Sequence, residues 1–205
     1  MITLSNISVM NFENAIRGAR NPMNSWEKSD SHTVNGTEFV LGENDLALAT
    51  RLCRAGSDHR KFIRQIFVSM DINAPLYWWK EFDTYKVGTV ANSTSTMHKI
   101  HSKPFELRDF STDRLHEGSL KVLSTLIDHL EALRLSYLET KDKETWYNII
   151  QLLPTSYHQL RTCTLNYEIL TNIYHARRAH KLQEWRTFCD QIKQLPYATE
   201  MIIHR

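Results

Sequence analysis

Cysteine, proline and glycine are scarce in this chain of 205 residues, which contains three, five and six of them, respectively. The cysteines form no CxxC pair, and an odd number of them does not complete a disulfide framework, so we expect reduced, buried thiols at Cys53, Cys163 and Cys189. Reduced thiols are typical of a cytoplasmic protein. Ten histidines are present but show no metal-ligand spacing such as HExxH, so no metal site is predicted.

Long apolar runs and charge of one sign are also missing. No stretch of about 18 uncharged apolar residues occurs, and the start, MITLSNISVMNF, has no basic segment or long apolar core. We therefore expect neither a membrane span nor secretion. The formal net charge of +2, without a long basic block, argues against nucleic acid as a partner. The length favours a single domain over residues 1–205.

The first part of the chain mixes extended and turn-forming segments. ITLSNISVM alternates as a strand does, and TVNGTEFVL places Asn35-Gly36, a strong turn signal, between β-forming residues. An early sheet or hairpin is predicted. Residues 17–31, between these segments, are rich in glycine, asparagine, proline and serine, and are predicted to form a loop anchored by Trp26.

Helical periodicity dominates the remainder. A helix is predicted from residue 43 to about Gly56, followed by a second helix or a strand over residues 62–67. Residues 113–139 carry one apolar stripe, from Leu115 through Val122 to Leu133, which is typical of a core or an oligomer seam. Two further helices are predicted over residues 142–152 and 165–195, each ended by a proline.

The last predicted helix carries polar side chains at helical spacing. Asn166, Leu170, Ile173, Arg177 and Leu182 share roughly one side of it. Polar neighbours flank that side, namely Glu168, Asn172, His175 and Gln183. Burying an amide or a guanidinium without a partner costs about 2 to 7 kcal/mol, so these groups need each other or a ligand if this side is buried. The alternative is an ordinary solvated face.

Residues 75–105 gather aromatic rings, charges and hydroxyls. Trp78, Trp79, Phe82 and Tyr85 line one predicted helix, which Gly88 ends before a run of hydroxylated residues. Aromatic faces beside hydroxyls and amides suit a flat heterocycle and a phosphate. The alternative is an aromatic core helix followed by a surface loop.

The order of these parts resembles the flavin-dependent thymidylate synthases, the ThyX family. In that family a segment PIFVxRQWxRHRxxSxNExSxRY precedes LPxxxxTxxxxTxNxRxLxNFxxLRxxxxAQxE, and the resemblance covers roughly residues 62–195. The second motif is similar in outline, with matching residues at Leu153, Pro154, Thr164, Asn166, Leu170, Asn172, Arg177, Gln183 and Glu184.

The first motif is similar in shape but differs in chemistry. Its RHRxxS part falls on residues 84–89, so Lys86 is the remaining cation and Thr89 the remaining hydroxyl. The preceding glutamine corresponds to Glu81. The ExSxRY part falls on residues 92–97, where Thr94 keeps the hydroxyl and Thr96 replaces the phosphate-binding arginine.

Two more arginines of the family are replaced here, one by Glu168 and one by Ile150. Each lost charge-assisted hydrogen bond is worth about 1.5 to 3 kcal/mol, so a nucleotide monophosphate needs other cations. The candidates near the hydroxyl run are Lys86, His98, Lys99, His101 and Lys103, unless they are solvated surface cations.

The resemblance implies an α+β fold, in which a small antiparallel sheet packs with several long helices, and a homotetramer. It implies FAD as cofactor, a pyrimidine deoxynucleotide such as dUMP as substrate, reduced folate or NADPH as further reactants, and transfer of a one-carbon unit. By resemblance, the cofactor-binding residues are Lys86, Thr89, Asn166 and Asn172. The substrate-binding residues are Glu81, Tyr85, Thr94, Thr96 and Arg177, and Arg177 is also the catalytic candidate.

Two alternatives remain from the sequence. The altered first motif favours a ThyX-fold binding or scaffold protein that has lost the reaction. A helical module for nucleic acid, with Trp78, Trp79 and Tyr85 stacking on bases, is disfavoured by the low net charge.

Overall fold

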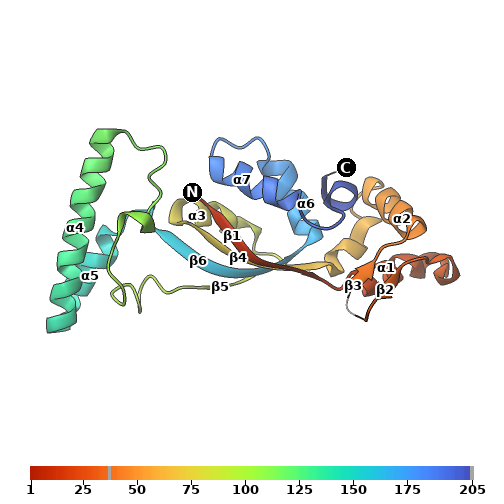
Figure 1. Ribbon diagram of the computed structural model, residues 1–205, viewed down its shortest axis with the longest axis horizontal. Coiled ribbons are helices and arrows are strands. Elements are labelled where there is room, and N and C mark those ends of the chain that lie inside the picture. Colours follow the sequence, from red (N-terminus) through yellow and green to blue (C-terminus); the bar gives the residue numbers. More distant parts are fainter. Residues whose placement is uncertain (37, 204–205) are drawn as a thin grey trace. The chain divides into compact units, whose positions relative to one another are not determined.

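The computed structural model describes residues 1–36 and 38–203 of the chain. The residues outside this description are Thr37, which falls in the predicted hairpin, and residues 204–205, which fall at the end of the predicted domain. The predicted α+β class is confirmed: a small antiparallel sheet is combined with several helices (Figure 1). The larger sheet has four strands in the order β1-β4-β6-β5, and a second sheet pairs β2 with β3.

The strand and the hairpin that the sequence predicts near the start of the chain are both present. The strands are β1 (Thr3–Met10), β2 (His32–Val34), β3 (Glu38–Val40), β4 (Phe67–Pro75), β5 (Val90–Ser93) and β6 (His158–Asn166). In the hairpin Val34 pairs with Glu38 and His32 with Val40, so the Asn35-Gly36 turn is confirmed. Along β4 every second residue is buried, which is the period expected of a strand with one covered face.

The helices are α1 (Phe12–Arg20), α2 (Glu43–Arg54), α3 (Leu76–Phe82), α4 (Glu117–Thr140), α5 (Lys143–Leu152), α6 (Tyr167–Arg177) and α7 (Gln183–Ile192). Short 3-10 or π turns are η1 (Asn21–Met23), η2 (Trp26–Lys28), η3 (Arg60–Gln65), η4 (Asp83–Tyr85), η5 (Leu107–Asp109) and η6 (Thr199–Ile203). The helices predicted from residue 43 and over residues 113–139 and 142–152 are confirmed within a few residues, as α2, α4 and α5.

The prediction of one helix over residues 165–195 is wrong. The chain is extended through β6 up to Asn166, whose Oδ1 accepts a hydrogen bond from the backbone N–H of Ile169 at 3.0 Å and so starts α6. After Arg177 the helix stops, and the backbone N–H of Leu182 binds His180 Nδ1 at 3.2 Å before α7 begins. Leu182 is therefore not on the same helix face as the residues of α6.

The loop predicted over residues 17–31 is also partly wrong, because α1 extends to Arg20 and two 3-10 turns follow. Trp26 anchors this segment by a hydrogen bond and not by burial. Its indole N–H donates to Asn21 Oδ1 at 2.9 Å, while half of the residue stays exposed.

The hydroxylated run after Gly88 is not a simple loop. Gly88 has a φ of +79°, in the region that favours glycine, and the chain then extends into strand β5, next to β6 in the sheet. The preceding helix α3 ends at Phe82, and Tyr85 lies in the turn η4 that follows.

By its contacts the chain divides into two compact units, described separately below. Unit 1 comprises residues 1–3, 72–84 and 92–162, and unit 2 comprises residues 4–71, 85–91 and those from 163 onward. Strands β4 and β6 run from one unit into the other. None of the helices among the described residues is long and apolar enough to cross a membrane.

Unit 1 has a core between α4, α5 and the segment before them. In Figure 1, α4 and α5 lie side by side. The buried cluster consists of Ile100, Phe105, Phe110, Leu123, Ile127, Leu130, Ile149 and Tyr157. Much of the predicted α4 stripe is therefore core, but Val122 is 71% exposed and Leu115 precedes the helix. In α3, Trp78, Trp79 and Phe82 are buried against one another, as in an aromatic core helix.

Unit 2 is built around α6, which packs against α7, η3 and η6. The apolar residues of α6 that are buried here are Tyr167, Ile169, Leu170, Ile173 and Tyr174. Cys53, Cys163 and Cys189 are buried, as the sequence predicts, and form no disulfide among the described residues. A fully buried carboxylate, that of Asp45, binds Arg20 Nε at 2.5 Å.

Candidate functional site

Arg177, the principal candidate, lies at the end of α6 between two aromatic rings of unit 2. Its Nε donates a hydrogen bond to the hydroxyl oxygen of Tyr85 at 2.9 Å. Its guanidinium carbon lies 4.8 Å from the ring centre of Trp185 and 5.6 Å from that of Tyr85. The Tyr85 and Trp185 rings meet edge to face with centres 6.0 Å apart. These contacts fix the plane of the guanidinium, because both stacking and the hydrogen bond depend on its orientation.

Trp185 is the residue of this cluster that the sequence reasoning missed. It is fully buried in α7 and lies eight positions after Arg177. In a single straight helix, residues eight positions apart are too far from each other to stack. The break between α6 and α7 brings the two together. The available signal was a tryptophan shortly after a helix end that carries a cation. This signal could be interpreted only by recognising the break between α6 and α7.

A tight turn over residues 86–89 meets the start of α6. A Cβ built on Gly88 would lie 3.1 Å from Ile169 Cδ1 and 3.6 Å from Asn166 Nδ2, so the backbone of the turn approaches the helix closely. Lys86 is exposed in this turn, and its carbonyl oxygen accepts a hydrogen bond from the Thr89 backbone N–H at 3.3 Å. The turn therefore joins two predicted cofactor-binding residues, Lys86 and Thr89, to a third, Asn166.

Thr89 has a buried hydroxyl oxygen that forms no hydrogen bond with any of the described residues. A buried hydroxyl without a partner costs about 1 to 3 kcal/mol, so a contact with water, an ion or a ligand would stabilise it. Asn172, by contrast, is on the exposed side of α6. Unit 2 thus gathers Tyr85, Lys86, Thr89, Asn166 and Arg177 along α6 and the turn.

Glu168, which takes the place of a family arginine, is held by Arg60. Arg60 Nε donates to Glu168 Oε2 at 2.8 Å and Nη2 to Oε1 at 2.7 Å, with both side chains nearly buried. The carboxylate is therefore part of a structural ion pair in unit 2, which the sequence alone did not indicate.

In unit 1, Thr94 follows β5 and is tied to β6 through Leu160. The Thr94 backbone N–H donates to the Leu160 carbonyl at 2.9 Å, and the Thr94 hydroxyl donates to the same oxygen at 3.3 Å. The Gln159 side-chain amide donates to the Thr94 carbonyl at 2.8 Å. Thr94 is thus held firmly in position, while Thr96, two residues later, is half-buried in a turn.

Arg161 is a cation of unit 1 that the sequence reasoning did not select. Its guanidinium lies 4.1 Å above the Trp79 ring, and it donates to Asp83 Oδ1 at 2.7 Å and to Gln159 Oε1 at 3.0 Å. Glu81, the predicted substrate-binding residue of α3, is half-buried. Arg161 lies two residues after Gln159 in strand β6, and alternate side chains of a strand share one face. This spacing was the sequence signal that Arg161 and Gln159 are neighbours.

The candidate replacement cations in unit 1 differ in their environments. His98 and Lys99 are exposed, whereas Lys103 Nζ donates to Asp109 Oδ1 at 2.6 Å. Burial is the largest single effect and acts to lower the pKa of Lys103, but the hydrogen bond to Asp109 and the charge interactions with Tyr157 and Asp109 together outweigh it and raise the pKa. His101 packs edge to face on Tyr137, with ring centres 4.8 Å apart. Lys103 is therefore committed to a carboxylate of its own unit.

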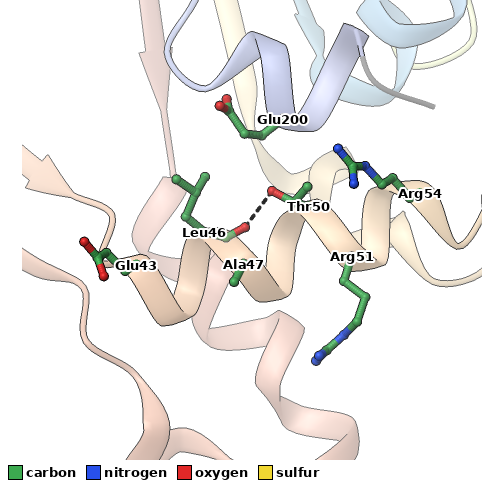
Figure 2. Close-up of a pocket in the computed structure, with 7 residues that line it drawn as sticks. All are labelled: Glu43, Leu46, Ala47, Thr50, Arg51, Arg54 and Glu200. Carbon is green, nitrogen blue, oxygen red and sulfur yellow. Dashed lines mark hydrogen bonds between the residues drawn. The ribbon is translucent and has the colours of Figure 1, made fainter.

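A shallow pocket lies elsewhere in unit 2, over α2 and η6 (Figure 2). Figure 2 shows that its charged side chains do not converge: Glu43 and Arg54 lie at opposite ends, and Arg51 points away from Glu200. The Thr50 hydroxyl is used within the helix, donating to the Leu46 carbonyl at 2.7 Å. None of the predicted site residues lines this pocket.

The comparison with solved structures identifies the fold. The ThyX enzyme of Helicobacter pylori, a flavin-dependent thymidylate synthase solved with FAD and dUMP, superposes with a TM-score of 0.70 at 18% identity, and the alignment covers 97% of this chain and 98% of that one. A second structure of the Helicobacter pylori enzyme, also with FAD and dUMP, gives the same TM-score and identity over 98% and 96% of the two chains.

The UMP/dUMP methylase PolB of Streptomyces cacaoi, solved with 5-Br dUMP, has a TM-score of 0.62 at 16% identity, covering 100% of this chain and 93% of that one. No protein-family model matches the sequence. No curated protein sequence matches it either. The predicted ThyX-like fold is confirmed, and this chain is a divergent example of it.

Proposed function

We propose that this chain, which has the ThyX fold, binds FAD and a pyrimidine deoxynucleotide and transfers a one-carbon unit to the pyrimidine. The observation that carries the proposal is the buried Thr89 hydroxyl, which has no hydrogen-bond partner among the described residues and belongs to the turn that corresponds to the RHRxxS motif. The solved neighbours from Helicobacter pylori contain FAD and dUMP, which supports the same ligand classes here.

The residues along α6 fit a flavin nucleotide. The Thr89 hydroxyl supplies a donor for a phosphate or ribose oxygen, and Lys86, exposed in the same turn, supplies a positive charge. Gly88 has no side chain, which leaves the backbone of the turn close to Asn166. The Asn166 Oδ1 already caps α6, so its Nδ2 is the atom we assign to the cofactor.

Arg177 is assigned to the pyrimidine. Tyr85 and Trp185 hold the plane of its guanidinium, and a fixed guanidinium recognises a carbonyl oxygen by directed hydrogen bonds at a lower entropic cost than a mobile one. Tyr85 also belongs to the substrate side in this proposal. Thr94, Thr96 and Glu81 of unit 1 are assigned to the nucleotide phosphate and sugar on the resemblance alone.

Flavin, when bound, supplies the hydride chemistry. The chain's own residues then position the nucleotide and exclude water, and no cysteine nucleophile is needed in this proposal. The buried Cys163 and Cys189 agree with this, because burial raises the pKa of the Cys189 thiol to about 12 and keeps it protonated. A reduced folate or NADPH as the further reactant, and a homotetrameric assembly, complete the proposal.

One observation favours a second candidate, a ThyX-fold binding protein without the reaction. Glu168 stands where the family has an arginine, and its carboxylate is neutralised by Arg60 in a nearly buried pair. A site rebuilt in this way has less positive charge for phosphates. This candidate predicts nucleotide or partner binding without turnover.

The first test is the absorbance spectrum of the purified protein before and after addition of FAD, followed by titration of dUMP into the flavin complex. The proposal expects flavin bands that shift with dUMP, and product formation once reductant and methylene folate are added. A protein that takes up FAD and dUMP without product supports the second candidate. A protein that takes up neither ligand contradicts the first candidate and favours a binding protein for another partner.

A pair of variants sharpens this test. Thr89→Val replaces the buried hydroxyl with a methyl of similar size, so the free energy of unfolding should stay equal or rise by up to about 1 kcal/mol while FAD affinity falls about tenfold or more. The control is Thr33→Val on the exposed strand β2, which should leave FAD affinity unchanged. Equal FAD affinity in the wild type and Thr89→Val would contradict the assigned role of this hydroxyl.

A further inference from the structure

A second hollow of unit 2 has a polar lining that the proposed function does not use. It lies between α1, the turns η1 and η2, and the end of η3. Its volume is about 780 Å³, within the range of small-molecule sites. No residue that the proposed function assigns contributes to its lining.

Helix α1 presents amides to this hollow. Asn14 and Gly18 lie four residues apart in the helix, Asn11 directly precedes it and Asn21 directly follows it, and all four line the hollow. Asn14 Nδ2 donates to Asn11 Oδ1 at 2.7 Å, and Asn11 Nδ2 donates to the Gln65 carbonyl at 2.9 Å. These bonds fix the wall of the hollow and use up amide acceptors.

The wall that remains is rich in donors and carries a positive charge. Arg17 Nη2 donates to Asn14 Oδ1 at 2.8 Å, which leaves its Nη1 side for another acceptor. Among the described residues Arg17 has no ion pair, although Glu13 lies one helical turn before it. The side-chain oxygen of Asn21, Oδ1, accepts the hydrogen bond from the Trp26 indole, so the side-chain nitrogen Nδ2 remains as a donor.

The remaining wall is aromatic. Trp26 lines the hollow with half of its surface exposed, and its ring is oriented by the 2.9 Å hydrogen bond to Asn21. An oriented and exposed indole beside amides provides a flat apolar surface for the C–H face of a sugar ring. Opposite, a Cβ on Gly18 would lie 3.4 Å from Gln65 Oε1, so glycine leaves the space that a larger residue would fill.

We propose that this hollow binds a phosphorylated sugar. Arg17 receives the phosphate, the amides of Asn21 and Gln65 bind the hydroxyls, and the sugar ring packs on Trp26. A phosphate dianion suits the guanidinium because charge-assisted hydrogen bonds are about twice as strong as neutral ones. The site is separate from the one along α6 and stands independently of the proposed function.

The test is calorimetric titration of the whole chain with D-ribose 5-phosphate, followed in parallel by tryptophan fluorescence. Saturable binding with a change in fluorescence is expected, together with much weaker binding of ribose alone and of inorganic phosphate alone. Equal affinity for inorganic phosphate would reveal a simple anion site and overturn the proposal. Absence of saturable ribose 5-phosphate binding would overturn it as well.

Three variants locate the site. Arg17→Gln and Trp26→Ala change exposed side chains and should each weaken binding about tenfold. Arg17→Gln should leave the melting temperature nearly unchanged, whereas Trp26→Ala also removes the hydrogen bond to Asn21 and should lower the melting temperature slightly. Gly18→Leu should abolish binding by filling the hollow. The matched controls are Arg178→Gln, an exposed cation after α6, and Gly118→Leu, at a glycine with open space around it. Full binding by Arg17→Gln and Trp26→Ala would overturn the assignment.

A competition with FAD completes the design. If the two sites are separate, saturating FAD leaves ribose 5-phosphate binding unchanged. Displacement of ribose 5-phosphate by FAD would assign the hollow to the flavin and overturn a separate sugar phosphate site.

Discussion

Arg60 and Glu168, separated by 108 positions in the sequence, form two hydrogen bonds at 2.7 and 2.8 Å in the interior of unit 2. The pair ties η3 to the first turn of α6, the helix that carries Asn166 and Arg177. The hydrogen bond to Glu168 raises the pKa of Arg60 further, against the opposing effect of burial. The geometry of the candidate site therefore depends on this pair.

Breaking that ion pair should destabilise the protein strongly. Arg60→Met removes the guanidinium that neutralises the nearly buried Glu168 carboxylate, and such changes cost about 3 to 5 kcal/mol. The double variant Arg60→Met with Glu168→Leu should lose much less than the sum of the single losses, as measured by urea unfolding. Additive losses would show that the two side chains are not energetically coupled.

Gly42 should tolerate no side chain. It precedes α2, and Asp30 supplies the cap of that helix by accepting from the backbone N–H groups of Asn44 and Asp45 at 2.8 and 3.1 Å. A Cβ on Gly42 would lie 2.6 Å from the Asp30 carbonyl carbon. We expect Gly42→Ala to cost about 1 to 3 kcal/mol of unfolding free energy. Gly118→Ala, where nothing lies within 4 Å, is the control and should cost nothing.

Stability should fall in acid partly through Asp45. Burial acts to raise the pKa of this carboxyl, but hydrogen bonds from Ser29, Ser31 and Arg20 together outweigh it and lower the pKa. The pKa of Asp45 in the folded protein lies below that in the unfolded chain, which is about 3.9. The carboxylate's contribution to stability is therefore complete above the unfolded pKa and is lost as the pH falls through the folded pKa.

The check is urea unfolding from pH 6 to pH 2. Asp45→Asn should be less stable than the wild type at pH 6, with a smaller difference at the acid end. The exposed Asp58→Asn is the control and should keep the wild-type slope. A difference between Asp45→Asn and wild type that does not change with pH would refute the assignment.

The thiols should react only after unfolding. Burial raises the pKa of Cys53 to about 12, and that of Cys189 to about 12 as well, while Cys163 is fully buried. At mildly alkaline pH the thiolate fraction is then very small. Iodoacetamide should label the native protein slowly and label three thiols per chain in denaturant. Fast labelling of the native protein would contradict the buried positions.

Arg177→Ala should remove ligand binding at a modest cost in stability. The variant loses the stacking on Trp185 and the hydrogen bond to Tyr85, worth together about 1 to 2 kcal/mol at a half-buried position. FAD or dUMP affinity should fall about a hundredfold if the guanidinium binds ligand. Arg178→Ala, the exposed neighbour, is the control.

Tyr85→Phe gives a finer test of the same cluster. It removes the hydroxyl that accepts from Arg177 Nε and keeps the ring. We expect a smaller loss of dUMP affinity than for Arg177→Ala, with melting temperature nearly unchanged. Loss of stability without loss of affinity in both variants would make Arg177 a structural residue.

Local patterns predicted the elements whose signals are contained in a short segment. The hairpin at Asn35-Gly36, the apolar period of α4 and the prolines that limit helices are all visible within a few residues. The prediction of one helix from residue 165 to 195 failed mainly at the break between α6 and α7, where the backbone N–H of Leu182 donates to His180 Nδ1, because a helical period in the sequence does not display such a break.

The sequence by itself determined the α+β class, the buried thiols and the positions of Thr89, Asn166 and Arg177 as candidates. Only the tertiary structure decided their partners. Tyr85 reaches Arg177 over 92 positions, and Arg60 reaches Glu168 over 108. Contacts at such separations depend on how the whole chain packs and not on local periodicity, so they are not encoded in any one segment.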